Sequence, residues 1–295
     1  VGVFTVTDDI GEDMEIGYRD SRDANGVATI WYATASIGSS TGTVSMDRQV
    51  YPVPFDLNEL KEGDNTNLND FNADGTTGDD GDVQIAIQVT DPDETGTTIA
   101  KSSAPVTIKL ITSGTTGTIG TAGGTVVGTT TNAALCNDAV SGCEYGPLTE
   151  IEQGSNVYEI TITLDETMTM TDGSTTHQVL GGQTVIQVTY ADPNGDNGLA
   201  TSVYDSSTFD LRNGSITTDK SVYVMGQTMV ITITDPDLDL DSATAETVSL
   251  GLIEWDSSAD SSELFNSGQF TINPTNLEET GDNTGVFQTS VDIPT

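Results

Sequence analysis

Aspartate and asparagine side chains recur along the chain at spacings that suit a hard cation. Residues 70–75 read Asp-Phe-Asn-Ala-Asp-Gly, which matches the opening of a calcium-binding loop. Gly81 stands where such a loop carries a bidentate glutamate, so a nearby aspartate would have to replace it. A solvated acidic loop is the alternative. The predicted calcium ligands are Asp70, Asn72, Asp74 and Asp79, with Asp80 and Asp82 as substitutes for the last.

Two further stretches are candidates for the same chemistry. Residues 192–198 read Asp-Pro-Asn-Gly-Asp-Asn-Gly, a weaker match whose ligands would be Asp192, Asn194 and Asp196. In residues 235–241 every second residue is an aspartate. In an extended chain such carboxylates project to one side, about 7 Å apart, and repel each other unless a cation bridges them. The alternative is a turn after Pro236 that scatters them into water. The residues concerned are Asp235, Asp237, Asp239 and Asp241.

The net charge of −38, from 46 acidic and 8 basic residues, restricts the partners of the chain. Phosphate backbones and anionic lipids would be repelled, and no run of residues resembles a membrane span. We therefore expect no nucleic-acid partner and no membrane-embedded segment. Divalent cations are expected partners because they offset the self-repulsion of such a surface. A salt-adapted surface without specific sites is the alternative.

The sequence lacks the residues that catalysis needs. His177 is the single histidine, and no orienting group accompanies it in the sequence. Phosphate-cradling loops of the GxxxxGK[ST] type are missing. Carboxylates are so abundant that any pair of them is uninformative about acid–base work. We expect that the protein is not an enzyme.

Two covalent features are expected. Cys136 and Cys143 flank a short polar loop without the CxxC spacing of zinc sites, which favours a local disulfide in an oxidising compartment. Two free thiols are the alternative. Asn213 begins the sole N-glycosylation sequon and is a candidate for modification, although one sequon is near what chance gives in a chain so rich in serine and threonine.

Short β-strands must position these residues. In residues 229–234, apolar side chains alternate with mostly threonines, which indicates a half-buried strand, and Pro236 ends it. No window has apolar residues at helical spacing over three turns. The balance of the composition is Thr, Ser, Gly, Asp and Asn, which is typical of many short strands joined by turns. The sequence predicts an all-β protein of antiparallel β-sandwich units with almost no helix.

The chain contains an internal repeat. Tyr18 and Tyr190 are 172 residues apart. The same offset relates Asp20 to Asp192, Gly26 to Gly198, Asp47 to Asp219 and Tyr51 to Tyr223. Five landmarks with one offset are poorly explained by chance, so we expect tandem copies of one structural unit.

Several phrases resemble the immunoglobulin-like repeats of archaeal surface-layer (S-layer) proteins, most closely those of ammonia-oxidising archaea (Nitrososphaerota/Thaumarchaeota). The resemblance covers most of the chain outside two polar insertions. The phrases are TDKSVYVMGQTMVITITDPDLDLDS (218–242), NLEETGDNTGVF (276–287), DMEIGYRDSRDANGVATIWYATAS (13–36) and GGQTVIQVTYADPNGDNGLATSVYDSS (181–207).

The resemblance also suggests where the units begin, because the Asp-Lys phrase opens a unit in that family. Residues 44–212 are then one complete immunoglobulin-like unit with insertions at 56–82 and 113–146. Residues 1–43 are the C-terminal half of a preceding unit, and residues 213–295 are the N-terminal half of a further unit. Two units, 1–156 and 157–295, are the alternative.

For function, the resemblance implies an extracellular protein of the cell surface that self-associates into a porous two-dimensional lattice, generally with calcium. The acidic coat is also expected to gather ammonium. The alternative is a secreted calcium-dependent adhesin or filament subunit whose sandwich units present the insertions to a partner.

Overall fold

The computed structural model describes residues 13–54, 81–112, 115–125, 143–164, 169–172, 175–178, 181–257, 260–264 and 272–293. Within these residues the chain is almost entirely β, mostly in antiparallel sheets, which confirms the predicted all-β sandwich class. The helical turns there are two 3₁₀ helices, η2 (Pro236–Leu238) and η3 (Leu250–Leu252). No helix in the described ranges has the length and hydropathy needed to cross a bilayer.

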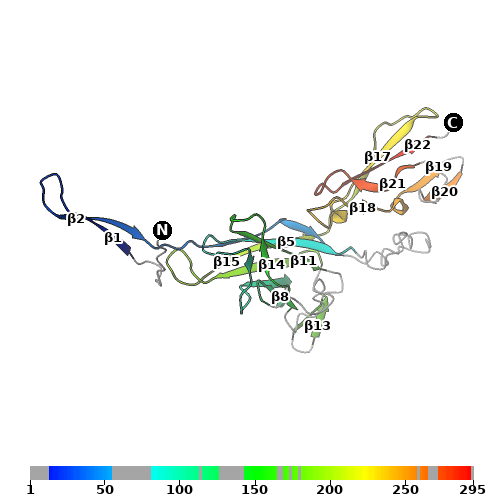
Figure 1. Ribbon diagram of the computed structural model, residues 1–295. Helices are drawn as coiled ribbons and strands as arrows, with labels where there is room; N and C mark the ends of the chain where they lie inside the picture. Colours follow the sequence, from blue (N-terminus) through cyan, green and yellow to red (C-terminus); the bar gives the residue numbers. More distant parts are fainter. Residues whose placement is uncertain are drawn as a thin grey trace.

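A two-sheet sandwich occupies residues 43–210, which we call the central unit (Figure 1). Its first sheet has the order β3 (Thr43–Met46), β5 (Val83–Thr90), β11 (Val157–Leu164), β10 (Leu148–Glu150), β6 (Thr98–Ile99). Its second sheet has the order β4 (Val50–Pro52), β15 (Thr201–Asp210), β14 (Val185–Asp192), β7 (Val106–Thr112), β8 (Thr115–Ala122), β9 (Cys143–Glu144). A separate hairpin, β12 (Thr169–Asp172) with β13 (Thr175–Gln178), lies between β11 and β14 in the sequence.

Alternating side chains build the core of the central unit. Every second residue of β5 is buried, from Val83 to Val89, and β14 buries Ile186, Val188 and Tyr190 in the same way. These two rows, one from each sheet, belong to one continuous apolar cluster. Removing this surface from water is the main driving force for the sandwich.

Strand β4 closes one edge of the second sheet by an unusual pairing. It runs parallel to β15, with Tyr51 opposite Phe209. The rings of these two residues pack with their centroids 5.8 Å apart, and both side chains are fully buried. The first strand of this sheet in the sequence is therefore bonded to the last.

The second unit, residues 215–293, repeats the first sheet of the central unit. Its five strands have the order β16 (Ser215–Thr218), β17 (Thr228–Thr234), β22 (Val286–Asp292), β21 (Ile272–Glu279), β18 (Thr247–Val248). Among the described residues, a further hairpin of β19 (Glu254–Ser257) with β20 (Asp260–Leu264) occupies the sequence position of β7 and β8. A smaller apolar cluster that includes Met229, Leu277 and Phe287 forms its core.

The first described element is a two-stranded hairpin of β1 (Asp13–Asp20) and β2 (Thr29–Ser36), which pairs with no other described strand. It projects from the end of the central unit opposite to the second unit (Figure 1). Its register equals that of β14 with β15 shifted by 172 residues, because Asp20 lies opposite Thr29 as Asp192 lies opposite Thr201. The hairpin is a second copy of the β14–β15 element.

An equivalent backbone hydrogen bond holds the linker before β3 and the linker before β16. The backbone N–H of Ser40 donates to Asp93 Oδ2 at 2.8 Å, and that of Arg212, 172 residues later, donates to Asp237 Oδ2 at 2.7 Å. The Arg212 guanidinium adds bonds to Asp237 and to the Pro236 carbonyl. Each linker is thus held by the second aspartate of an Asp-Pro-Asp phrase, and we call this contact the linker clamp.

Candidate cation-binding cluster

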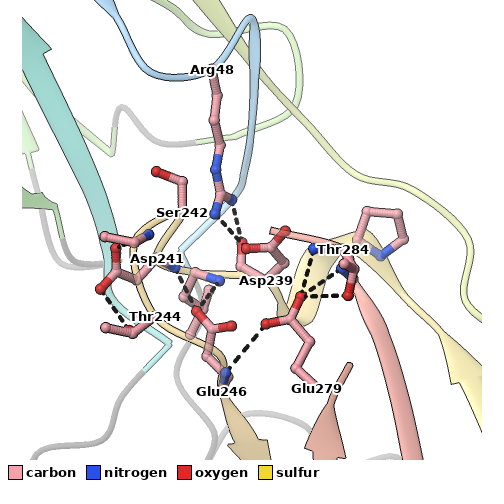
Figure 2. Close-up of polar contacts among 12 residues, drawn as sticks. Arg48, Asp239, Asp241, Ser242, Thr244, Glu246, Glu279 and Thr284 are labelled. Atoms are coloured by element: carbon pink, nitrogen blue, oxygen red, sulfur yellow. Dashed lines mark hydrogen bonds and ion pairs between the residues drawn. The ribbon is translucent and has the colours of Figure 1, made fainter. Parts of the chain in front are cut away.

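Three carboxylates converge where the second unit meets the central unit (Figure 2). Asp239 directly follows η2, Glu246 directly precedes β18, and Glu279 ends β21. One carboxylate oxygen from each lies within 4.8 Å of the others. Asp239 and Glu279 are buried and Glu246 is half-buried, so the three groups interact in surroundings that screen charge poorly.

Glu279 is held in place by the turn that follows β21. Its Oε1 accepts hydrogen bonds from Thr284 N–H at 2.7 Å, Thr284 Oγ1 at 3.0 Å and Gly285 N–H at 2.8 Å. Gly285 has a φ of 58°, a left-handed conformation that glycine adopts readily. Burial alone would raise the pKa of Glu279, but the hydrogen bonds from Glu246, Thr284 and Gly285 hold this pKa below its usual value. Glu279 is therefore a charged member of the cluster.

Glu246 has the opposite protonation preference. Its Oε1 accepts hydrogen bonds from Leu240 N–H at 3.0 Å and Asp241 N–H at 2.6 Å. Its Oε2 is buried, and no donor among the described residues lies within hydrogen-bond distance of it. Burial, followed by the interaction with Glu279, raises the pKa of Glu246 to about 8. This carboxyl group therefore keeps its proton at neutral pH unless another positive charge enters the cluster.

Arg48 brings the central unit into contact with the cluster. It lies between β3 and β4, and its guanidinium forms a buried ion pair with Asp239 and donates to the Asp239 carbonyl at 2.6 Å. Burial raises the pKa of Asp239, and the charge of Arg48 opposes that rise. Because the two residues come from different units, this ion pair connects the units.

The charge of the cluster depends on whether Glu246 carries its proton. With Glu246 protonated, two carboxylates face one guanidinium, and loss of the proton adds a further negative charge at the same place. Carboxylate oxygens are the ligands that calcium prefers, although calcium takes six to eight oxygens, so three carboxylates supply only part of a shell. Arg48 already occupies one oxygen of Asp239. The chemistry that this arrangement supports is cation binding in competition with a proton.

The structure separates the four aspartates of residues 235–241. The chain is not extended there, because η2 turns it after Asp235, whose side chain accepts the N–H of Asp237 at 3.0 Å. Asp237 bonds Arg212, and Asp241 accepts Ala243 N–H at 2.9 Å and Thr244 Oγ1 at 2.8 Å. Of the four predicted ligands, Asp239 is the one that joins a carboxylate cluster.

The candidate at residues 192–196 is a turn held by its first aspartate. Asp192 is buried, and its carboxylate accepts Gly42 N–H at 2.8 Å and Asn194 N–H at 2.7 Å. Asn194 and Asp196 are exposed, and Asp196 N–H donates to Thr41 Oγ1 at 3.0 Å. These contacts fix the β14–β15 connection to the linker that precedes β3.

Other predicted residues are only partly described. Asn213 is exposed in the link between β15 and β16. Of Cys143 the structure describes the backbone in β9. The loop residues Asp70, Asn72, Asp74, Asp79 and Asp80 lie outside the described residues, and so does Cys136.

Sequence reasoning missed Glu246, Glu279 and Arg48. Glu279 belongs to the ETGDNTGVF phrase, so its place in a repeated motif was an available signal. No such signal marked Glu246, because the central unit has a threonine, Thr97, at the equivalent position. The two positions are equivalent because the Thr97 carbonyl accepts the N–H of Glu150 as the Glu246 carbonyl accepts the N–H of Glu279. Arg48 is 191 residues from Asp239, and nothing in the local sequence indicates that they meet.

A scan of the chain against protein-family models gives no match, and a search of curated proteins gives none either.

Proposed function

We propose that this chain is the repeating part of a structural, self-associating, acidic layer of S-layer type on the outside of an archaeal cell. The observation that supports the proposal most directly is the repeated linker clamp, Ser40 to Asp93 and Arg212 to Asp237. Units joined by equivalent contacts form an extended array with a regular repeat. Such an array suits a protein coat.

The charge supports a role for cations in this proposal. At a net charge of −38, copies brought side by side repel each other unless cations screen or bridge them. The proposed assembling cation is calcium. Among the described residues its candidate site is the cluster of Asp239, Glu246 and Glu279, with the loop at residues 70–79 as a second candidate from sequence.

Electron microscopy of the purified chain tests the proposal. In about 5 mM calcium, above the dissociation constants typical of extracellular calcium sites, we expect sheets that repeat in two directions. Excess chelator should disperse them, and sodium chloride at equal ionic strength should not replace calcium. Filaments that repeat in one direction would support the filament alternative instead. Particles that stay dispersed in calcium would contradict the proposal.

Ammonium enrichment is a separate part of the proposal. Equilibrium dialysis at low salt should show ammonium accumulating on the protein side, because the carboxylates attract monovalent cations over a Debye length of about 30 Å at 0.01 M. Amidation of the surface carboxylates should abolish the excess. Equal ammonium on both sides of the membrane before amidation would leave only the scaffold role.

A further inference from the structure

Acidic residues are placed unevenly in this strongly acidic chain. Its net charge is −38, from 46 acidic residues, yet none of them lies in β3, β4, β5, β7, β8, β16 or β17. The described aspartates stand mostly in turns, in linkers and at strand ends, as Asp47, Asp93 and Asp237 do. Like charges repel, so two copies approach each other most easily through surfaces without carboxylates. The outer faces of the sheets are surfaces of this kind.

The outer face of the second sheet of the central unit carries no carboxylate over four strands. The outward positions of β14, β7 and β8, and those of β15 as far as Thr208, hold one tyrosine and otherwise hydroxyl, amide and small or apolar residues, with Lys109 as the single charged residue. The other side of the same strands carries the buried row with Ile108, Val188 and Phe209. Because the central unit has both of its sheets, this face points outward whatever lies beyond the two ends of the sequence.

Tyr204 is the large side chain of this face. It is 70% exposed and belongs to neither apolar cluster. The β1–β2 hairpin has a tyrosine, Tyr32, at the equivalent position, because Tyr32 lies opposite Gly17 as Tyr204 lies opposite Thr189. An outward ring adds nothing to the core of its own unit, so the fold does not explain why both copies have one. Tyrosine is enriched at the centre of protein–protein contacts.

The neighbours of Tyr204 on this face are short. Ser202 and Ser206 lie two residues away on the same side of β15, and Thr189 lies across from Tyr204 on β14. The ring thus forms a ridge on an otherwise low surface. A two-fold rotation about an axis beside the ring places the ridge of each copy over the serines of the other.

We propose that this face binds the same face of a second copy of this chain across a two-fold axis, with the two Tyr204 rings side by side. The contact brings no carboxylates together, and the one charge on each face, Lys109, lies two strands away from Tyr204. Packed aromatic rings contribute beyond the area that they bury. The inference deepens the proposed self-association and rests on it for its biological setting, but the contact needs no divalent cation.

The size of the face indicates a weak contact that acts through repetition. Four strands about 4.8 Å apart, with about three outward residues each, cover roughly 400 Å² per copy, or about 800 Å² in a pair. Stable complexes bury about 1,200–2,000 Å², so isolated pairs should form only at high protein concentration. In a layer, many such contacts act together, and the effective concentration at each contact is high.

Sedimentation equilibrium of exposed-site variants tests this contact. Tyr204→Glu and Tyr204→Lys each place like charges opposite each other in the pair, and Thr161→Glu is the matched control because Thr161 is exposed on the outer face of the first sheet. All chains, the reference included, carry Tyr32→Glu, which removes the equivalent ring of the hairpin from the comparison. Chelator removes calcium, and about 1 M sodium chloride, with a Debye length of about 3 Å, removes long-range repulsion but screens enclosed charges much less.

We expect the reference and Thr161→Glu chains to pair with the same dissociation constant, below about 1 mM. Tyr204→Glu and Tyr204→Lys, each alone, should pair about tenfold more weakly or worse, because like charges then meet within the contact. An equal mixture of the two should regain the pairing of the reference, since glutamate then faces lysine. A reference chain that stays monomeric at about 1 mM, a mixture that pairs no better than its components, or equal weakening by Thr161→Glu would overturn the inference.

Calcium-dependent sheets of the wild-type chain are a separate result. Sheets formed equally by wild type and by Tyr204→Glu would leave the proposed function standing and would reject this face as its contact. Pairing in chelator without sheets in calcium would leave the contact standing and would reject the layer.

Discussion

Asp47 and Asp219 make the same contact in two units: each accepts a tyrosine hydroxyl at 2.6 Å, from Tyr51 and Tyr223 respectively. Each also accepts a backbone N–H from the neighbouring strand at 2.8 Å. At the residue scale, several repeated aspartates thus act as hydrogen-bond acceptors that fix turns and linkers. A carboxylate can accept several donors at once and binds them more strongly than a neutral acceptor.

Glu246 should make the stability of the protein depend on pH in a distinctive way. Its pKa is about 8 in the folded protein against a usual 4.5, so folding favours the protonated form. The stabilisation is complete below pH 4.5 and is lost as pH rises through about 8. In chelator, Glu246→Gln should remove this loss, so the advantage of the variant over wild type should increase between about pH 3.5 and 9, about one unit outside the two pKa values.

Denaturant unfolding at a series of pH values measures this difference, and Glu278→Gln is the matched control because Glu278 is the exposed neighbour of Glu279 on β21. Calcium should reduce the pH dependence of wild type, since a bound cation stabilises the ionised carboxylate. A difference between wild type and Glu246→Gln that is constant with pH would contradict the assigned protonation.

At the element scale, the turns after β3 and β16 contain the same tyrosine–aspartate hydrogen bond in two environments. Tyr51 is fully buried and Tyr223 is half-buried, yet both bond their aspartates at the same distance. Tyr51→Phe should lower the free energy of unfolding by about 1–3 kcal/mol because it removes a hydrogen bond from a buried tyrosine to a charged acceptor, and Tyr223→Phe by less than about 1 kcal/mol. Chemical denaturation of both variants makes the comparison, and equal losses would contradict it.

The elements themselves were largely predictable, but their meeting points were not. Alternation in residues 229–234 indicated β17, and the 172-residue offset indicated that β1–β2 and β14–β15 are copies, because both signals are local or periodic. The cluster depends on contacts between distant segments. Asp239 was a candidate as part of an aspartate run. Glu246 joins it through the fold of the second unit, and Arg48 joins it through the contact between the two units.

At the scale of the whole molecule, Arg48 and Asp239 tie the second unit to the central unit. Arg48→Met should lower the free energy of unfolding by about 3–5 kcal/mol, because it leaves the buried Asp239 carboxylate without its partner. The double variant Arg48→Met, Asp239→Leu should recover most of that loss, since neither charge then remains buried.

Calorimetry of the single and double variants gives both values, and small-angle scattering reports whether the units lose their fixed arrangement. If Arg48→Met is as stable as wild type, the ion pair does not hold the second unit to the central unit. A double variant no more stable than the single one would assign the loss to packing of the long side chains instead.

The parallel pairing of β4 with β15 gives the central unit a mechanical property. β4 lies near the start of the unit and β15 ends it, so tension along the chain pulls these two strands in opposite directions along their common axis. Their hydrogen bonds and the Tyr51–Phe209 contact are then loaded together, in shear, and do not open one after another. In the proposed surface layer, where osmotic pressure would stretch the chain, this arrangement would let the β4–β15 contacts resist the stretch together.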